Sequence, residues 1–200
     1  MKPTVFIVDD DASIRDALTQ LLEAVGLQVE TYADGSRFLS TYSEDQPGCL
    51  VLDMAMPGMS GADVQTELKS LGLVIPIIFL SGHGDIRMAV RAMQDGAVDF
   101  LEKPIPGTEL IQRVQRALAL DAEWRETRAY VLTTLRNYAR LSAREREVMT
   151  LTAAGLTSKE IARQLGISPR TVEVHRSHVM HKMGAENVAE LVSMAAHCTP

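Results

Sequence analysis

Residues 4–10 read Thr-Val-Phe-Ile-Val-Asp-Asp, an apolar run that ends in two acidic residues. A second apolar run, Cys-Leu-Val-Leu over residues 49–52, is followed by Asp53, and two later runs lead to Ser81 and Lys103. If these runs are parallel strands, their carboxyl ends meet at one edge of one sheet. Carboxylates, a hydroxyl and an ammonium would then form a site for a divalent cation and a phosphoryl group.

Strand and helix patterns alternate along residues 1–107. Continuous apolar strands that alternate with amphipathic helices predict a parallel sheet covered on both faces. Right-handed crossovers favour a flavodoxin-like (βα)5 α/β fold with the strand order 2-1-3-4-5. The expected strands are 4–8, 28–32, 49–52, 76–80 and 99–101, and the expected helices are 13–25, 36–41, 61–71 and 86–94.

A long helix is expected over residues 108–140, which contain no glycine or proline. Apolar residues repeat there at spacings of four and three from Leu110 to Tyr138, with charged residues at Asp121 and Arg128. Such a seam is typical either of a helix that packs on its own domain or of a helix that pairs with a second one. We expect an α/β domain over 1–120, a linker over 121–140 that continues its last helix, and an all-α domain over 141–200.

The last sixty residues carry helix start and stop signals. Ser142 with Glu145, and Thr157 with Glu160, have the spacing of capping boxes. Four helices are expected, over 142–154, 157–165, 169–183 and 187–196. The middle two are joined by a short turn that contains Gly166, and they form a helix-turn-helix.

Charge is distributed unevenly along the chain. Residues 1–107 carry 7 basic and 16 acidic side chains, whereas residues 141–200 carry 7 basic and 6 acidic ones. An acidic front half repels nucleic acid, so any such binding belongs to the rear. No apolar run reaches the ~20 residues of a membrane span, and the layout of a signal peptide is missing. With Cys49 and Cys198 far apart and outside redox motifs, we expect a reduced, cytoplasmic chain with no membrane partner.

The acidic residues near the amino terminus admit two interpretations. Clustered carboxylates repel each other, and a hard cation such as Mg²⁺, or alternatively Mn²⁺ or Ca²⁺, relieves the repulsion. Asp53 would then be a nucleophile, with Lys103 and Ser81 contacting phosphoryl oxygens. Alternatively, Asp9, Asp10 and Asp11 merely cap the helix that starts near Ser13, where acidic residues are common. The second interpretation leaves Asp53, Ser81 and Lys103 unexplained.

Four segments, over residues 6–11, 52–61, 80–85 and 100–104, resemble the receiver domain of two-component response regulators. The resemblance implies that Asp53 is the phosphoacceptor and that Ser81 and Lys103 contact the phosphoryl group. It also implies that Phe100 rotates on activation and that the Lys103–Pro104 bond is cis. Magnesium would be held by Asp9, Asp10, Asp53 and the backbone carbonyl of Ala55. Ala55 departs from the family, which often has a polar residue there.

Residues 141–148 and 166–178 resemble the LuxR-type (GerE) DNA-binding domain, so the whole chain resembles NarL/FixJ-family regulators of the FixJ and StyR-like group. On the third helix of the tail, Val172, His175, Val179 and Met183 share one face and are expected to pack inward. By the resemblance, the base-reading positions are Glu173, Val174 and Ser177. The candidates for phosphate contacts are Lys159, Arg170, Thr171, Arg176 and Lys182.

These patterns predict a transcription regulator, not an enzyme. A histidine kinase would phosphorylate Asp53, the receiver would then form a homodimer through residues 86–94 and 99–101, and the dimer would bind promoter DNA. No small-molecule substrate beyond phosphodonors is expected. One alternative is a magnesium-dependent phosphohydrolase, which is disfavoured because Ala55 stands where a second acid/base aspartate would be. The other is a DNA-binding protein that acts independently of phosphorylation.

Overall fold

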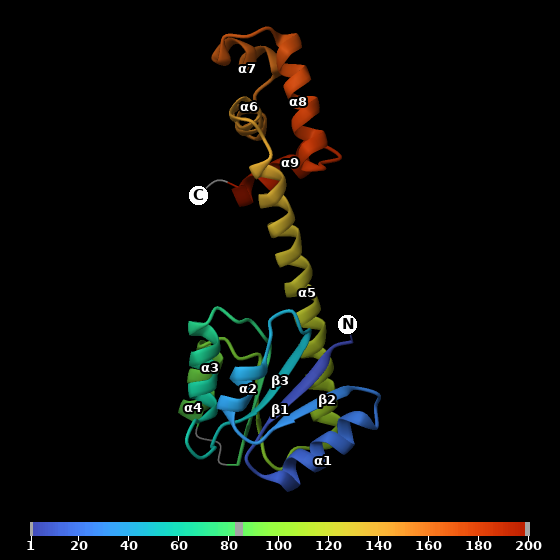
Figure 1. Ribbon diagram of the computed structural model, residues 1–200, viewed down its shortest axis with the longest axis vertical. Coiled ribbons are helices and arrows are strands. Elements are labelled where there is room, and N and C mark those ends of the chain that lie inside the picture. Colours follow the sequence, from blue (N-terminus) through green and yellow to red (C-terminus); the bar gives the residue numbers. More distant parts are fainter. Residues whose placement is uncertain (1, 83–85, 199–200) are drawn as a thin grey trace. The chain divides into compact units, whose positions relative to one another are not determined.

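The computed structural model describes residues 2–82 and 86–198, and the chain divides after Trp124 into two compact units (Figure 1). The first unit holds a five-stranded parallel sheet in the order β2-β1-β3-β4-β5. This is the predicted order. The strands are β1 (Thr4–Val8), β2 (Gln28–Tyr32), β3 (Gly48–Asp53), β4 (Ile77–Ser81) and β5 (Asp99–Glu102).

Helices cover both faces of the sheet, as the continuous apolar strands predicted. The helices α2, α3 and α4 contribute to the core on one face, and α1 and the first part of α5 pack on the other (Figure 1). None of the helices in the described part of the chain is both long and apolar enough to cross a membrane. The bounds are α1 (Ala12–Glu23), α2 (Gly35–Thr41), α3 (Gly61–Ser70), α4 (Ile86–Gln94) and α5 (Gly107–Ala139).

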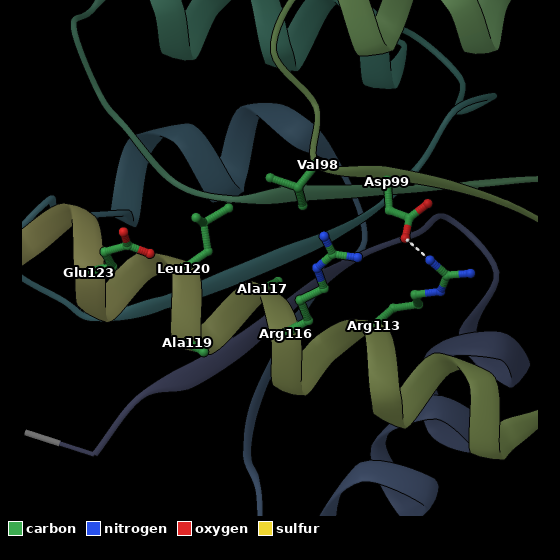
Figure 2. A pocket seen from close by; sticks show the side chains of 8 residues that line it. All are labelled: Val98, Asp99, Arg113, Arg116, Ala117, Ala119, Leu120 and Glu123. Atoms are coloured by element: carbon green, nitrogen blue, oxygen red, sulfur yellow. Dashed lines mark hydrogen bonds and ion pairs between the residues drawn. The ribbon is translucent and has the colours of Figure 1, made fainter.

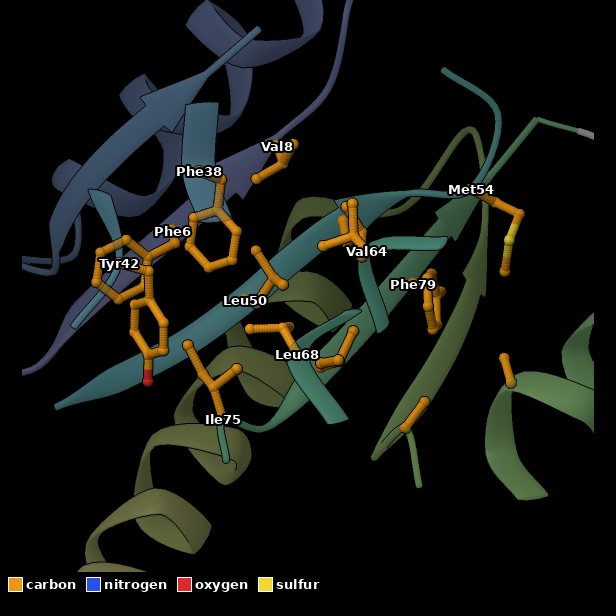
Figure 3. Close-up of a cluster of buried hydrophobic side chains, with 14 of the residues drawn as sticks. Phe6, Val8, Phe38, Tyr42, Leu50, Met54, Val64, Leu68, Ile75 and Phe79 are labelled. Carbon is orange, nitrogen blue, oxygen red and sulfur yellow. The ribbon is translucent and has the colours of Figure 1, made fainter. Parts of the chain in front are cut away.

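Alternate residues of β1 enter the two cores, because successive side chains of a strand point to opposite faces. Phe6 and Val8 belong to the cluster shown in Figure 3, whereas Val5 and Ile7 belong to the cluster under α1 and α5. In the first cluster the centre of the Phe6 ring lies 5.7 Å from the centre of the Phe38 ring. These cores fix the ends of β1 and β3, from which the acidic side chains project.

The seam along α5 begins as packing on its own domain. Leu110, Val114 and Ala117 are buried against the sheet. Asp121 continues this buried face, and its carboxylate accepts a hydrogen bond from the N–H of Gly48 at 2.8 Å. Asp121, one of the two charged residues in the apolar seam, is therefore buried and serves as a hydrogen-bond acceptor for β3.

The second unit contains α6 (Ala143–Ala153), α7 (Ser158–Leu165), α8 (Pro169–Met183) and α9 (Val188–Cys198), in addition to the end of α5. The predicted capping boxes at Ser142 and Thr157 are both formed. A left-handed Gly166 ends α7, and its φ of 66° explains why glycine is favoured there. The helix-turn-helix predicted from sequence is thus made by α7 and α8.

Two small clusters form the core of the second unit. One contains Val148, Ile161 and Val172, and the other contains Val179 and Met183 with side chains of α9. Three of the four α8 residues expected to face inward are therefore buried. The fourth, His175, is partly buried.

The single tryptophan of the chain, Trp124, lies in the first unit. It is partly buried and lines a groove of about 240 Å³ together with residues of α3 and the α3–β4 connection, among them Leu68 and Leu73.

Candidate functional site

Asp9 and Asp53 lie side by side at the carboxyl edge of the sheet. β1 and β3 are neighbours in register, with Val8 opposite Leu52, so the residues that follow reach the same edge. Both carboxylates are nearly buried, with exposed fractions of 1% for Asp9 and 6% for Asp53. The sequence-based expectation that distant acidic residues meet at this edge is met for these two.

Lys103 bridges the two carboxylates from the loop after β5. Its Nζ donates to Asp9 Oδ2 at 2.7 Å and to Asp53 Oδ1 at 2.5 Å. Burial by itself would lower the pKa of Lys103, but the hydrogen bonds and charges of Asp53 and Asp9 outweigh it, and the pKa is raised. Lys103 is therefore a positively charged ammonium between two carboxylates. The Lys103–Pro104 peptide bond is cis, as the resemblance implied.

The other oxygen of Asp53 is held by the main chain. The N–H of Ala55 donates to Asp53 Oδ2 at 2.9 Å, which fixes the rotation of the carboxylate. Ser81 ends β4 and is buried, and its carbonyl accepts from the N–H of Lys103 at 2.7 Å. β3, β4 and the loop after β5 therefore bring Asp53, Ser81 and Lys103 to one place.

Phe100 lies farther from this group, on β5. It is partly buried, is paired in register with Phe79, and its ring centre lies 6.4 Å from that of Phe79. This places an aromatic ring at the edge of the core, next to the strand that ends in Ser81. Its role as a switch stays a prediction.

The predicted metal ligands are only partly gathered. Asp10 is exposed, and among the described residues no group of three or more His, Cys, Asp or Glu side chains is placed to hold a metal ion. Asp9 and Asp53 nevertheless share one cation, the Lys103 ammonium, and offer the carboxylate oxygens that a hard divalent cation prefers. These two residues fit such an ion, whereas ligation by Asp10 and by the Ala55 carbonyl stays a prediction.

Sequence reasoning missed Arg15. Its Nη1 donates to the main-chain carbonyl of Asp9 at 2.7 Å. The sequence offered one sign of this contact, which is that a basic residue stands near the start of the helix that follows the acidic run.

The predicted DNA-contacting face of α8 is accessible. Arg170, Glu173, Val174 and Ser177 are exposed, and Lys159 and Thr171 are exposed as well. The Ser158 hydroxyl of α7 donates to the Glu173 carboxylate and accepts from Arg176 Nη1, the latter at 3.0 Å. Ser158 thereby orients two of the side chains that were expected to face DNA.

Lys182 differs from the other phosphate-contact candidates because it has an acidic partner. Its Nζ donates to Oε2 of the buried Glu145 at 2.7 Å. This hydrogen bond, together with that from the N–H of Ser142, lowers the pKa of Glu145 from 4.5 to about 2. Lys182 thus fastens α8 to the start of α6, a role that its position on a basic helix did not reveal.

A larger cavity, of about 490 Å³, lies between α5 and the start of β5 (Figure 2). Figure 2 shows Arg113 and Arg116 reaching over it from α5, with Arg113 Nη1 bound to Asp99 Oδ2 at 2.9 Å. The amino end of β5 lies at the opposite edge of the parallel sheet from Asp53. The cavity therefore does not belong to the acidic site.

Two known protein families match the chain. Residues 5–115 match the family described as "Response regulator receiver domain", and residues 139–195 match "Bacterial regulatory proteins, luxR family". The first match lies within the first unit of the structure and the second within the second unit.

The chain also matches similar proteins and solved structures over most of their length. "Nodulation protein W" of Bradyrhizobium diazoefficiens is 46% identical over 194 residues, which are 97% of this chain and 86% of that protein. "Response regulator protein TodT" of Pseudomonas putida is 44% identical over 188 residues, which are 94% of this chain and 83% of that protein. The solved structure of the response regulator StyR matches with a TM-score of 0.86 at 44% identity, covering 98% of this chain and 99% of that one. The solved structure of full-length FixJ from B. japonicum matches with a TM-score of 0.60 at 39% identity, and the match covers 99% of this chain and 98% of that one.

Proposed function

Because this chain belongs to the response regulators that join a receiver domain to a LuxR-type DNA-binding domain, we propose that phosphorylation of Asp53 controls the binding of α8 to promoter DNA. The observation that supports this most directly is the pairing of Asp53 with Lys103 at the carboxyl edge of the sheet. A nucleophilic carboxylate and a fixed cation beside it suit the transfer of a phosphoryl group to an aspartate, and Ser81 could contact the transferred group.

The chemistry follows from the two oxygens of Asp53. The Ala55 N–H holds Oδ2, and Lys103 contacts Oδ1. One carboxylate oxygen attacks phosphorus while the bond from phosphorus to the imidazole nitrogen of a histidine kinase breaks, and that imidazole leaves with the electron pair. Lys103 offsets the negative charge of the transferred group. A divalent cation, which we take to be Mg²⁺ with Mn²⁺ or Ca²⁺ as alternatives, would be held by Asp9, Asp10, Asp53 and the Ala55 carbonyl, and it would supply positive charge that offsets the charge of the phosphoryl group.

The proposed switch couples this site to α4 and β5. Ser81 would turn toward the phosphoryl group, and Phe100 would turn inward beside Phe79. Apolar side chains on α4 stand in solvent, with exposed fractions of 79% for Ile86, 49% for Val90 and 45% for Met93. A changed α4–β5 surface, over residues 86–94 and 99–101, would bury them against a second copy, which gives a homodimer on phosphorylation.

DNA binding is proposed for the exposed face of α8. Glu173, Val174 and Ser177 would face base edges in the major groove. Residues 141–200 carry a formal charge of only +1, so a single copy would bind weakly and pairing on a two-fold site matters. The phosphate contacts are proposed for Lys159, Arg170, Thr171, Arg176 and Lys182. The corresponding division is a receiver over 1–120, a linker over 121–140 and a DNA-binding domain over 141–200, in a cytoplasmic protein.

The test is phosphorylation of the full chain by acetyl phosphate with Mg²⁺, measured by mass spectrometry, followed by titration of promoter DNA. Wild type is expected to gain one phosphoryl group and to bind DNA more tightly, whereas Asp53→Asn gains none. Asp16→Asn, an exposed acidic position on α1, is the matched control and should behave as wild type. Full phosphorylation of Asp53→Asn would contradict the assignment of the phosphoacceptor. Equal DNA affinity with and without phosphate would remove the switch, and steady turnover of simple phosphate esters would favour the phosphohydrolase alternative.

A further inference from the structure

We propose that Arg15 is a positioning residue of the phosphorylation site, because its guanidinium fixes the peptide unit that joins the two acidic residues Asp9 and Asp10. The inference rests on the proposed function in one respect, namely that a divalent cation binds at these carboxylates.

The contact begins where the strand ladder stops. The pairs of β1 with β2 and with β3 end at Val8, and the carbonyl of Asp9 lies beyond them. Arg15 Nη1 donates to this carbonyl at 2.7 Å, and Arg15 is itself partly buried. A hydrogen bond from an ionised donor at this distance is among the stronger ones in proteins.

The start of α1 directs Arg15 back toward the strand. Asp11 caps the helix by accepting from the N–H of Ser13 at 2.8 Å, and the carbonyl of Asp11 accepts from the N–H of Arg15 at 3.1 Å. Side chains of a helix lean toward its amino terminus, so an arginine one turn inside the helix reaches the preceding strand end.

Asp9 has a partner at every polar group. Its N–H donates to the Tyr32 carbonyl at 3.2 Å, Oδ1 accepts from the N–H of Asp11 at 2.9 Å, and Oδ2 accepts from Lys103 at 2.7 Å. Arg15 takes the one remaining group, the carbonyl. The Asp9 carboxylate is therefore fixed by other residues, and what Arg15 adds is control of the peptide plane.

Asp10 depends on that plane. It is exposed, and the structure, within its described residues, gives its carboxylate no hydrogen bond or ion pair. The carbonyl of Asp9 and the N–H and Cα of Asp10 belong to one planar peptide unit. Arg15 thereby sets the direction from which the Asp10 side chain starts, and Asp10 is the least held of the three predicted carboxylate ligands.

Positioning and simple charge predict opposite results. The positive charge of Arg15 repels a divalent cation, so if charge were its only influence, removing it would tighten metal binding. If Arg15 acts by holding the peptide, removing it weakens binding because Asp10 is no longer directed. Residues that orient metal ligands change metal affinity by about 10–100-fold when they are replaced.

The experiment is calorimetric titration of the full chain with Mg²⁺ for wild type, Arg15→Gln, Arg15→Lys and Arg116→Gln. Arg116→Gln removes the same charge from α5, beside the amino end of β5 and away from the acidic edge. We expect the Kd for Mg²⁺ to rise about tenfold in Arg15→Gln. It should rise less in Arg15→Lys, which keeps the charge without the planar fork, and should stay unchanged in Arg116→Gln.

A second measurement separates positioning from general destabilisation. If Arg15 acts on metal binding, excess Mg²⁺ restores phosphorylation of Arg15→Gln by acetyl phosphate to the wild-type extent. An unchanged or lowered Kd in Arg15→Gln would overturn the inference, as would a loss of phosphorylation that excess Mg²⁺ does not restore. Should Arg15→Gln fail to fold, Arg15→Lys decides, and an unchanged Kd in that variant overturns the inference. Wild type that binds no Mg²⁺ and accepts no phosphoryl group would instead contradict the proposed function, and the inference with it.

Discussion

The main-chain N–H of Gly48 donates a hydrogen bond to the carboxylate of Asp121 across 73 residues of sequence, at 2.8 Å. Gly48 is the first residue of β3, and a Cβ there would lie 2.0 Å from the carbonyl oxygen of Thr4. The same strand ends in Asp53. The bond therefore fastens helix α5 to the strand that carries the candidate phosphoacceptor.

Replacing Asp121 with alanine should leave the buried Gly48 N–H without its acceptor and lower the free energy of unfolding by about 1–3 kcal/mol. Asp121→Asn keeps a side-chain oxygen at the same place and should cost less. Urea unfolding of the full chain, followed by circular dichroism, measures both. Equal losses in the two variants would mean that the Gly48 bond is not what Asp121 contributes.

Gly61→Ala should disturb the candidate site through the main chain that carries Asp53. A Cβ at Gly61 would lie 2.4 Å from the main-chain carbonyl oxygen of Asp53 and 3.1 Å from the Cα of Met54. The start of α3 must move away, and overpacking of this kind costs about 1–3 kcal/mol. We expect slower phosphorylation by acetyl phosphate together with the loss of stability. Gly82→Ala, where a Cβ meets open space, is the comparison for stability.

The second unit should lose stability in acid through Glu145. Its pKa is lowered from 4.5 to about 2 in the folded chain, so the stabilisation is fully present above about pH 4.5 and is lost as the pH falls toward 2. Glu145→Gln should flatten this part of the dependence of stability on pH. Urea midpoints measured across that interval test it, and an unchanged profile in Glu145→Gln would exclude Glu145 as its source.

Replacing Arg170 or Lys182 with glutamine should have different effects on DNA binding and on stability. Arg170 is exposed, so Arg170→Gln should weaken DNA binding and reduce the slope of log affinity against log salt by about 1. Lys182→Gln leaves Glu145 without its ammonium partner and should chiefly lower the stability of the second unit. A full unit change of slope with unchanged stability in Lys182→Gln would show that Lys182 acts chiefly on DNA phosphates and not through Glu145.

The strand order could be predicted because it follows from local patterns. Apolar runs separated by amphipathic segments specify a parallel sheet, and the handedness of crossovers leaves few arrangements. The meeting of Asp9, Asp53 and Lys103 then follows from where each strand ends. Caps at Ser142 and Thr157 are also local, since both partners lie within four residues.

Two of the three missed features join residues that are distant in sequence. From sequence, Asp121 was only a charged residue in an apolar seam. Its partner is the main-chain N–H of Gly48 in β3, and a main-chain group leaves no sign in the sequence. Lys182 was named as a candidate for phosphate contacts, and its hydrogen bond to Glu145 was not foreseen because Glu145 had already been given a role in a cap. Arg15 binds a carbonyl, and a carbonyl has no signature in sequence.

Because the chain's one tryptophan lines the groove beside Leu68 and Leu73, its emission reports on the packing of the first unit. Far-ultraviolet ellipticity, by contrast, averages over the helices of both. Comparing the two signals in a single denaturant series resolves which half of the protein a substitution has weakened, without separating the halves or attaching a dye.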